Sequence, residues 1–489
     1  MRDNCIKVFK GVFMKKILII GGGLLGSTIL FSASKKLCIT KCLEKNIDIC
    51  EETSGANSAI IHSGYDPKPG TLKAKLNVRG NYLYDDLCKK LDVGFSRIGS
   101  LTLARSYDEM VELQKLENRA RVNGVYVEIL NQEHIRKMEP NVSSGVIGAL
   151  YAPTCGIVNP FELCYAATEV AIANGASLHL GEEVIAIQQE NEGYRVTTTK
   201  SSYYADVVIN CAGVHADKIH NMLFEDKETI LPRKGEYHIL DHFDDDYVNH
   251  VLFSVPTEKG KGAVVAPTTS GNYIIGPSSE FVDSKEDVSV SKEVLDEIEE
   301  NVLKLVKTLP KEHIVHQFAG LRAVHTSDDF VIRRTKGFID VLGIQSPGLA
   351  AAPAIAEMVL ELVKEVVPLE EKKDAILTRK RPPKLSKLSN EERNELVKQN
   401  PNYGKIICRC EQISLGEIED ALASKIPPKT IKAVKKHTRA GFGTCQGGFC
   451  EPLILEILAK HQNIAKEEVL YKNEHSYIVK KDEGSGEEL

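Results

Sequence analysis

Residues 15 to 26 read KKILIIGGGLLG, and this stretch predicts the fold of the first part of the chain. The apolar run from Lys15 to Ile20 is typical of a buried parallel strand, and Gly21, Gly23 and Gly26 follow it at GxGxxG spacing. Glycines at this spacing allow a tight turn, a close approach of backbone to a pyrophosphate, and close packing of a helix on the strand. The free N–H groups at the start of that helix would face the phosphates.

A second strand and a carboxylate strengthen the motif. Cys38 to Leu43 (CITKCL) is another apolar strand candidate, and Glu44 ends it. A carboxylate about 20 residues after the first glycine is expected to bind a ribose hydroxyl. The pattern disfavours the alternative, which is an ordinary glycine turn followed by a surface glutamate. The sequence therefore predicts a dinucleotide site, but this motif alone does not separate NAD from FAD.

Size and composition indicate a globular protein with several domains. The chain has 489 residues, 42% hydrophobic and 27% charged, which suggests about two to four domains. The net charge of −6 gives no electrostatic case for nucleic-acid binding, and no apolar run approaches the length of a membrane span. Twelve cysteines without a secretion signal indicate a reducing compartment, the cytoplasm. Met14 is an alternative start for the folded chain, because the preceding residues carry no recognisable signal.

Strand and helix patterns follow one another as far as about Val363. Expected strands lie within residues 177–180, 182–190, 194–200, 205–213, 262–277 and 331–344, and an expected helix lies within 347–363. The turns at Glu192-Gly193 and at residues 270–272 predict two hairpins. Residues 370–400 are rich in charge and contain two prolines, which predicts a connector. A separate module is expected from Pro401.

Five stretches carry a likeness to a known family: SGANSAIIHSGYDPKPGTLKAKLNVRGN (54–81), PRKGEYHIL (232–240), EKGKGAVVAPTTSGNYIIGP (258–277), AGLRAVHTSDDFVI (319–332) and GIQSPGLAAAPAIAEMV (343–359). Together they resemble the FAD-dependent glycerol-3-phosphate dehydrogenases of the anaerobic type, within the superfamily of FAD-dependent amine and hydroxy-acid oxidoreductases. The resemblance covers most of residues 14 to 365. It implies an α/β Rossmann-like FAD-binding domain with an inserted antiparallel α+β substrate domain.

The resemblance also implies a set of residues that contact FAD. The phosphates would rest on Gly21, Gly23, Leu24, Leu25 and Gly26, and the ribose on Glu44. The remaining expected contacts are Thr53, Ser54, Asn57 and Ser58 along the pyrophosphate and flavin, Val184 on the adenine side, and Ala212, Gly213, Gly348 and Leu349 closing over the cofactor. For the last glycines, a helix start without any ligand stays an alternative.

The chemistry implied by this family requires a base and fixed cations. Oxidation of a secondary alcohol by a flavin needs a group that takes the hydroxyl proton, and His62 matches the family position for it. A phosphate-bearing substrate needs positive charge, for which Arg322 and Lys261 match, with Lys259 as the alternative lysine. Weaker candidates near the substrate are Lys234, Tyr237 and Ser346.

Four cysteines near the end of the chain predict a metal site. Cys408 and Cys410 form a CxC pair, and Cys445 and Cys450 form a Cx4C pair. Structural zinc usually takes CxxC pairs, whereas four thiolates also hold 2Fe–2S clusters. The stretches ICRCEQIS and TRAGFGTCQGGFC resemble the bacterioferritin-associated ferredoxin domain, which favours the iron–sulfur cluster over zinc. Glycines expected to let backbone N–H groups approach the sulfurs are Gly441, Gly443, Gly447 and Gly448.

The expected domain boundaries follow from these motifs. The FAD-binding domain would comprise residues 14–90, 151–230 and 321–369, and the substrate domain residues 91–150 and 231–320. A linker at 370–400 would lead to a small helical 2Fe–2S ferredoxin-like domain at 401–462 and a tail at 463–489.

The resemblance implies an enzyme that oxidises sn-glycerol 3-phosphate to dihydroxyacetone phosphate. Electrons would pass from FAD through the 2Fe–2S cluster to a further acceptor, which the sequence does not identify and for which a partner protein is one candidate. The C-terminal module is equally compatible with docking to a partner subunit, in a complex that associates peripherally with a membrane. Two alternatives remain open. One is oxidation of L-2-hydroxyglutarate or an amino acid on the same scaffold, and the other is an electron-transfer subunit without its own substrate turnover.

Overall fold

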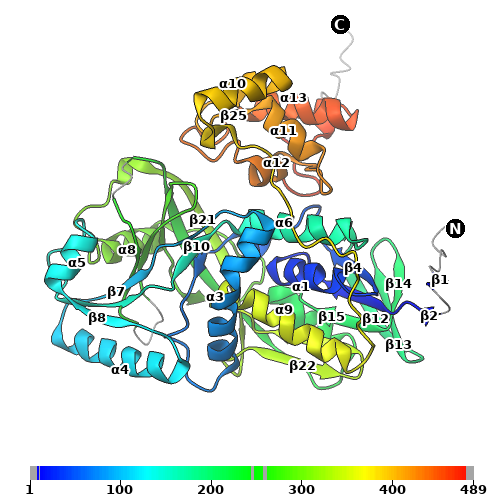
Figure 1. Ribbon diagram of the computed structural model, residues 1–489, viewed down its shortest axis with the longest axis horizontal. Coiled ribbons are helices and arrows are strands. Elements are labelled where there is room, and N and C mark those ends of the chain that lie inside the picture. The colour runs from blue at the N-terminus through cyan, green and yellow to red at the C-terminus, as the bar shows by residue number, and fades with distance from the viewer. Residues whose placement is uncertain (1–7, 10–11, 244–246, 257–261, 481–489) are drawn as a thin grey trace, which may run out of the picture. The chain divides into compact units, whose positions relative to one another are not determined.

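The structure is a computed structural model of the chain, and it describes residues 8–9, 12–243, 247–256 and 262–480. Internal contacts divide the chain into two units. The larger unit comprises Met1–Lys45 and Ile49–Lys380, and the smaller unit comprises Asn46–Asp48 and Arg381–Leu489. In Figure 1 the larger unit runs from blue to yellow, and the smaller unit continues to orange and red.

A parallel sheet forms the centre of the nucleotide-binding part of the larger unit. Its strand order is β11-β4-β3-β15-β23-β22, and only β22 is antiparallel to its neighbour among these described strands. The bounds are β3 (Lys16–Ile20), β4 (Ile39–Glu44), β11 (Ser177–Leu180), β15 (Val207–Asn210), β22 (Val331–Thr335) and β23 (Phe338–Leu342). The predicted strands at the glycine motif are confirmed, because β3 pairs with β4 on one side and β15 on the other.

Helices cover one face of this sheet, and a small antiparallel sheet covers the other. The helices are α1 (Leu24–Ser34), α3 (Leu72–Leu91), α6 (Pro160–Ala173) and α9 (Gly348–Lys364). Ile17 and Ile19 pack with Ile29, Ile355 and Val359 in the core between β3 and the helices. On the opposite face lie β12 (Val184–Glu190), β13 (Gly193–Thr198) and β14 (Ser202–Ala205). The predicted hairpin is β12–β13, and β14 is a strand that the sequence patterns did not indicate.

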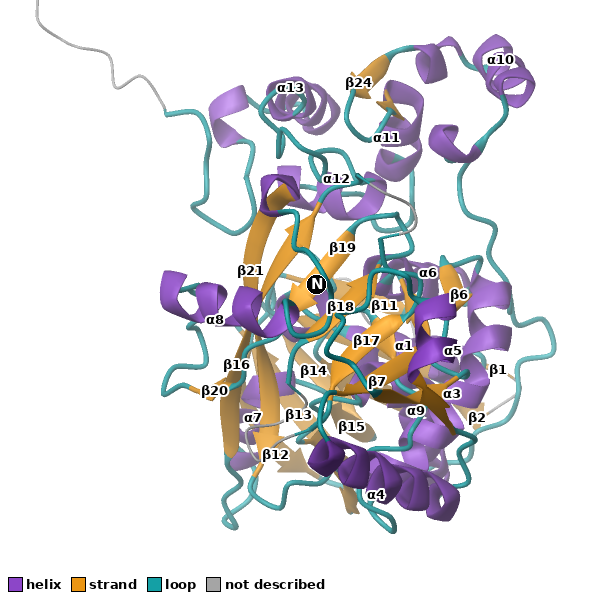
Figure 2. Cartoon of the chain, turned by 90° about the vertical axis from the view of Figure 1, so that its left-hand side faces the viewer, coloured by secondary structure: helices purple, strands orange, loops and turns teal. Residues whose placement is uncertain are grey.

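A second, mostly antiparallel sheet builds the substrate-facing part of the larger unit. Its order is β20-β16-β19-β18-β17-β7-β9-β8, with β21 also paired to β16. The bounds are β7 (Ser100–Ala104), β8 (Glu128–Asn131), β9 (Gly148–Ala152), β16 (Ile230–Leu240), β17 (Val251–Ser254), β18 (Val264–Pro267), β19 (Tyr273–Gly276), β20 (Glu280–Phe281) and β21 (Ile314–His325). Figure 2 shows β16 and β21 as two long strands side by side. The predicted second hairpin is β18–β19.

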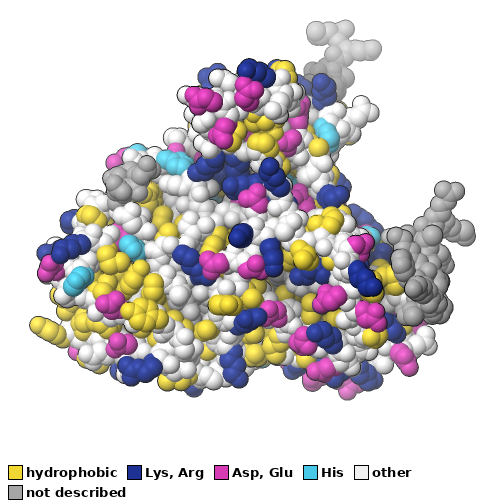
Figure 3. Space-filling model, in the orientation of Figure 1, with side chains coloured by type: hydrophobic (Ala, Val, Ile, Leu, Met, Phe, Trp, Pro, Cys, Tyr) yellow, Lys and Arg dark blue, Asp and Glu magenta, His cyan; other side chains and the backbone are white. Residues whose placement is uncertain are grey.

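Shorter elements complete the larger unit. They are β1 (Val8–Phe9), β2 (Val12–Phe13), α2 (Glu52–Gly55), β5 (Ile60–Ile61), β6 (Phe95–Arg97), α4 (Tyr107–Asn123), α5 (Gln132–Met138), β10 (Gly156–Val158), α7 (Ala216–Asn221) and α8 (Lys292–Val302). Strands β5, β10 and β6 form a small sheet of their own. On the face seen in Figure 3, acidic and basic side chains are interspersed over the larger unit, in keeping with the small net charge.

The smaller unit is mostly helical and has its own core. Its elements are α10 (Asn390–Gln399), β24 (Ile406–Cys408), β25 (Ile413–Ser414), α11 (Leu415–Leu422), α12 (Ile431–Thr438) and α13 (Glu451–Gln462). Cys408 and Cys450 belong to its buried core, together with Ile418, Val434 and Leu458. The predicted connector contains a helix, α10, that we did not expect. Reciprocal hydrogen bonds between Ser389 and Glu392 cap its first turn and stabilise it. No helix within the described ranges has the length and apolar character needed to cross a bilayer.

Candidate functional site

The glycine motif forms a close junction between β3, α1 and β15. Gly21 has a φ of +107°, and a Cβ there would lie 2.5 Å from the carbonyl oxygen of Cys211. A Cβ on Gly26 would lie only 1.8 Å from the carbonyl oxygen of Gly21. Helix α1 starts after Gly23, which has no side chain to cap it, and the Leu24 N–H donates to Ser54 Oγ. Backbone N–H groups and the positive end of the helix dipole are therefore presented here, as a pyrophosphate requires.

Glu44 and Val184 lie behind this junction. Glu44 ends β4 and is 8% exposed, and its carboxylate accepts a hydrogen bond of 2.6 Å from the Gly22 N–H. This bond fixes the carboxylate beside the glycine loop, at the position expected for a ribose contact. Val184 is buried at the start of β12, among the apolar side chains beneath the sheet.

One cavity of about 1700 Å³ brings most of the predicted site residues together. It is lined by the predicted cofactor residues Gly23, Leu24, Leu25, Thr53, Ser54, Asn57, Ser58, Gly213, Gly348 and Leu349, and by the predicted substrate residues His62, Tyr237, Arg322 and Ser346. Gly21, Gly26, Glu44, Val184 and Ala212 are not part of this lining. Lys259 and Lys261 lie outside the described residues. The cavity runs from the start of α1 to His62, so its length and lining fit a dinucleotide with a reactive ring.

Several polar side chains of the predicted cofactor set shape the wall by bonding to backbone. Ser54 Oγ accepts a hydrogen bond from the Leu24 N–H at 2.9 Å, which joins the loop after β4 to the start of α1. Thr53 Oγ1 donates to the carbonyl of Leu321 at 2.5 Å. Asn57 Nδ2 donates to the carbonyl of Ser54 at 2.7 Å. These bonds order the loop that lines the middle of the cavity.

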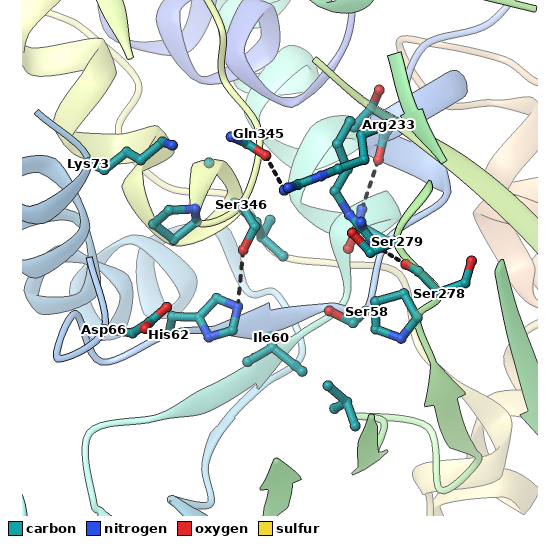
Figure 4. A pocket seen from close by; sticks show the side chains of 18 of the residues that line it. Ser58, Ile60, His62, Asp66, Lys73, Arg233, Ser278, Ser279, Gln345 and Ser346 are labelled. Atoms are coloured by element: carbon teal, nitrogen blue, oxygen red, sulfur yellow. Dashed lines mark hydrogen bonds between the residues drawn. The ribbon is translucent and has the colours of Figure 1, made fainter. Parts of the chain in front are cut away.

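His62 follows β5 and is held from both its backbone and its ring. Its carbonyl accepts hydrogen bonds from the side-chain amides of Asn77 (2.7 Å) and Asn81 (3.0 Å), which both lie on α3. The ring packs against Phe253 with 5.6 Å between ring centroids, and Nε2 lies 3.5 Å from Ser346 Oγ. Figure 4 shows the imidazole and the Ser346 hydroxyl directed toward each other in the pocket. The ring is therefore oriented and reachable, as a general base must be.

Four arginines line the same cavity, Arg105, Arg119, Arg233 and Arg322, and we predicted only Arg322. Arg322 on β21 donates from Nη2 to the carbonyl of Ser278 at 3.2 Å. Arg233 on β16 lies directly opposite Arg322 in the strand pair and was missed. Lys234, which we expected near the substrate, is absent from the lining and is instead paired with Asp287 at 3.0 Å. Because side chains alternate along a strand, Arg233 and Lys234 face opposite sides of β16.

Tyr237 lines the cavity and is stacked on Phe318, with 4.8 Å between ring centroids. It is 5% exposed, so it contributes mainly an apolar wall. Cys155 and Cys211 are both buried, and neither forms a disulfide.

The four cysteines of the smaller unit converge. Cys410 Sγ and Cys445 Sγ lie 3.7 Å apart, and the buried pair Cys408 and Cys450 shares a thiol hydrogen bond. That bond, together with the N–H groups of Gly441 and Glu411, lowers the pKa of Cys408 to about 6. A set of four thiolates directed at one place fits an iron–sulfur cluster.

Backbone N–H groups also approach the more accessible sulfurs. Burial raises the pKa of Cys445, but the N–H groups of Phe449 and Gly447 outweigh it and leave the pKa lowered. Gly441 and Gly447 have φ values of +93° and +92°, which let their N–H groups turn toward the sulfurs. Hydrogen bonds of this kind favour the thiolate, the form that binds metal.

A buried cation lies beside these cysteines. Lys435 on α12 is 6% exposed, and its ammonium lies 3.4 Å from Gln446 Oε1 and 4.7 Å from the centroid of the Phe442 ring. Burial lowers the pKa of Lys435 to about 8. The charges of Glu451 and Cys450 oppose this effect, and a negatively charged cluster would stabilise the ammonium further.

Two family models match the chain. The model described as FAD dependent oxidoreductase matches residues 16–362, and the model described as BFD-like [2Fe-2S] binding domain matches residues 406–460. The first covers the glycine motif and every predicted substrate residue, and the second covers the four cysteines. The cofactors are therefore FAD and a 2Fe–2S cluster, as predicted.

Similar proteins include both dehydrogenases and oxidases. The chain is 45% identical over 471 residues to a glycerol 3-phosphate dehydrogenase of Caloramator mitchellensis, covering 95% of this chain and 98% of the relative. It is 31% identical over 360 residues to a glycerol 3-phosphate oxidase of Mycoplasma genitalium, covering 71% of this chain and 94% of the relative. The solved structure of FAD-bound L-alpha-glycerophosphate oxidase from Mycoplasma pneumoniae matches with a TM-score of 0.72 at 28% identity, covering 76% of this chain and 100% of that one. The predicted fold is confirmed by these matches.

Proposed function

The chain belongs to the FAD dependent oxidoreductase family, and from this premise we propose that it oxidises sn-glycerol 3-phosphate to dihydroxyacetone phosphate. The relative that matches it over almost its whole length carries the name of that dehydrogenase. The observation that carries the proposal is the single cavity that joins the start of α1 to His62 and Arg322. It offers a dinucleotide site, a base and a fixed cation in one continuous space.

The bound groups supply redox chemistry that amino-acid side chains lack. FAD supplies a two-electron acceptor for the substrate hydride, and the 2Fe–2S cluster supplies a one-electron carrier. The protein contributes binding, orientation and proton transfer. In this proposal the start of α1 and the loop containing Ser54 hold the pyrophosphate, and the α9 start at Gly348 lies along the cofactor.

His62 is the proposed base. The proton of the substrate C2 hydroxyl passes to His62 Nε2, the ring nitrogen that faces the cavity beside Ser346 Oγ. Asn77 and Asn81 hold the His62 carbonyl, so the backbone that carries the ring is fixed. Removal of this proton lets the carbon–oxygen bond become a carbonyl as the hydride leaves C2.

Arg322 is the proposed cation for the phosphate. Its guanidinium is bound only weakly to the Ser278 carbonyl, so most of its donors remain for a ligand. A planar fork of N–H groups can bind a phosphate through two parallel hydrogen bonds. Lys261 stays a proposed second cation that polarises the substrate oxygen.

The acceptor of the electrons is a partner protein in this proposal. Cys410 is exposed, which leaves an open edge at the cluster site of the smaller unit. We also propose a cytoplasmic location, because no disulfide joins the described cysteines.

An anaerobic absorbance titration tests the function. Glycerol 3-phosphate should bleach the flavin bands of the purified protein, and reduction of the cluster should follow as a separate spectral change. L-2-hydroxyglutarate and amino acids are titrated in parallel. Bleaching by one of these but not by glycerol 3-phosphate would exclude the proposed substrate, and bleaching by none would favour an electron-transfer subunit.

His62→Ala tests the proposed base. The rate of flavin reduction by glycerol 3-phosphate should fall at least about 100-fold, since a general base contributes that much or more. FAD content should stay unchanged. The exposed His134 provides a matched control, and His134→Ala should reduce at the wild-type rate. A wild-type rate in His62→Ala would remove His62 from the mechanism.

A further inference from the structure

Arg233 brings a second guanidinium to the substrate end of the cavity. In the antiparallel pair of β16 and β21, Arg233 and Arg322 are direct partners, and both side chains line the cavity. Partners in such a pair have their side chains on the same face, with Cβ atoms about 5 Å apart. Figure 4 shows Arg233 reaching toward Gln345 at the rim of the space that also contains His62.

The two guanidiniums have no anionic partner among the described residues. Arg233 Nη2 donates to Gln345 Oε1, and Arg322 Nη2 donates to the Ser278 carbonyl, so both observed acceptors are neutral. Arg233 Nε is buried and has no hydrogen-bond partner in the described part of the chain. Burial and then the nearby charge of Arg322 lower the pKa of Arg233. Like charges placed directly opposite each other destabilise a sheet unless a counter-charge joins them.

The charge of Asp328 raises the pKa of Arg233, but the hydrogen bonds of this carboxylate go to other groups. Asp328 Oδ1 accepts hydrogen bonds from Lys73 Nζ at 3.0 Å and from Gln345 Nε2 at 3.3 Å. Gln345 thus bonds Asp328 through its amide nitrogen and Arg233 through its amide oxygen. Phe281 supports the guanidinium, with 5.8 Å from Arg233 Cζ to the ring centroid. None of these contacts is an ion pair with Arg233, so we expect a ligand to supply the anion.

We propose that Arg233 and Arg322 together form the site for the substrate phosphate, and that Arg233 sets the preference for a dianion over a single carboxylate. This inference rests on the proposed function. A phosphate has three terminal oxygens and charge for two forks, whereas one carboxylate satisfies a single fork. The loop before α9 links this site to the base, because Gln345 bonds Arg233 and the next residue, Ser346, contacts His62. Two consecutive residues therefore contact the groups that would bind the two ends of a short phosphorylated alcohol.

Binding of inorganic phosphate and steady-state kinetics test the inference on the holoprotein. Phosphate binding is measured through its perturbation of the flavin spectrum. Arg233→Met should weaken the affinity for phosphate by about 10- to 100-fold, the loss expected for charged hydrogen bonds. KM for glycerol 3-phosphate should rise by a similar factor while kcat changes less than about threefold. Arg233→Lys should recover part of the loss, because it keeps the charge but not the fork. Arg334 is a matched control: it is paired with Glu365, so Arg334→Met should leave both constants unchanged.

The outcomes separate this inference from the proposed function. If wild type oxidises glycerol 3-phosphate and Arg233→Met keeps the phosphate affinity and KM within twofold, the inference is wrong and the function stands. If phosphate binds and the variant weakens it, but glycerol 3-phosphate does not reduce wild-type flavin, the anion site stands and the function is wrong. FAD content and thermal unfolding report whether each variant folds. If Arg233→Met does not fold, Arg233→Lys and Gln345→Leu give the same comparison, and unchanged phosphate affinity in both would overturn the inference.

Discussion

The two units build their sites in opposite ways. In the larger unit, the residues of the candidate site come from segments spread between Gly23 and Ser346, and strands and helices hold the cavity walls in place. In the smaller unit, the four cysteines proposed as metal ligands lie within residues 408–450, and two of them are part of the hydrophobic core. From this difference we infer that the larger unit forms its FAD site by folding alone. We infer that the cluster, in contrast, contributes to the folding stability of the smaller unit.

The largest expected effect is loss of FAD on filling the glycine junction. A Cβ at Gly26 would overlap the Gly21 carbonyl, so Gly26→Ala must displace α1 from β3. Overpacking of this kind costs about 1–3 kcal/mol, and we expect FAD affinity to fall at least about 100-fold. The flavin spectrum of the purified variant measures this, and the cluster spectrum should remain. Gly145→Ala is the control, because a Cβ there meets only Ser143 Oγ at 4.0 Å. Loss of both cofactors in Gly26→Ala would contradict independent units.

Removing one cluster ligand should have the next largest effect. Cys450→Ser deletes a thiolate and a buried core side chain at once, so the 2Fe–2S spectrum should be lost and the unfolding midpoint of the smaller unit should fall by more than about 10 °C. FAD content and flavin reduction by substrate should persist. Cys164→Ala alters a buried thiol of the larger unit and should leave the cluster intact. If the unfolding midpoint of the smaller unit stayed unchanged after loss of the cluster, the cluster would not contribute to its stability, and the proposed difference between the two units would be wrong.

Neutralising the buried lysine should shift the cluster potential without removing the cluster. Lys435→Met deletes a positive charge beside the thiolates and should lower the midpoint potential by several tens of millivolts, since about 1 kcal/mol equals roughly 40 mV for one electron. Potentiometry followed by the cluster absorbance measures the shift. Lys432 lies on the same helix over the Tyr471 ring, and Lys432→Met should change the potential much less. Equal shifts in both variants would show a general charge effect.

The smallest effect concerns the pH dependence of the larger unit. Burial lowers the pKa of His238 on β16, despite the opposing charge of Glu299, so the folded protein binds this proton less readily than the unfolded chain. The stability contributed by neutral His238 is therefore present above about pH 6.5 and is lost as the pH falls below it. His238→Gln should reduce the fall in unfolding midpoint between pH 7.5 and 5.5 by roughly 2–4 °C. His134 is exposed, so His134→Gln should leave this pH dependence unchanged. If His238→Gln changed the pH dependence of the smaller unit only, the role of His238 in the larger unit would be refuted.

The sequence predicted the parts of each site that depend on local patterns. The glycine spacing, the strand that ends at Glu44 and the two cysteine pairs are all short-range signals, and the structure places β3, β4 and α1 accordingly. The helix α10 was missed because a polar, proline-flanked segment resembles a linker until its capping residues are weighed.

Arg233 was missed for a different reason. Its role depends on the register that places it opposite Arg322, and pairing between distant strands leaves no local mark. We had named Lys234, the next residue on β16, as a weaker candidate near the substrate. Neighbouring residues on a strand point to opposite faces of the sheet, so Lys234 points away from the cavity that Arg233 lines. Lys261 stays a prediction, because it lies outside the described residues.

One connection through α3 limits how the proposed base moves. The Asp329 carboxylate accepts the N–H groups of Leu72 and Lys73 at the first turn of α3, at 2.9 and 3.0 Å. The same helix carries the two asparagines that bond the His62 carbonyl. Because the His62 carbonyl is bonded to α3, and the first turn of α3 is bonded to Asp329, the imidazole adjusts only by rotation about its own side-chain bonds. Turnover at this site would then require little backbone rearrangement, and its barrier would reflect the chemistry and the exchange of ligands more than the motion of the base.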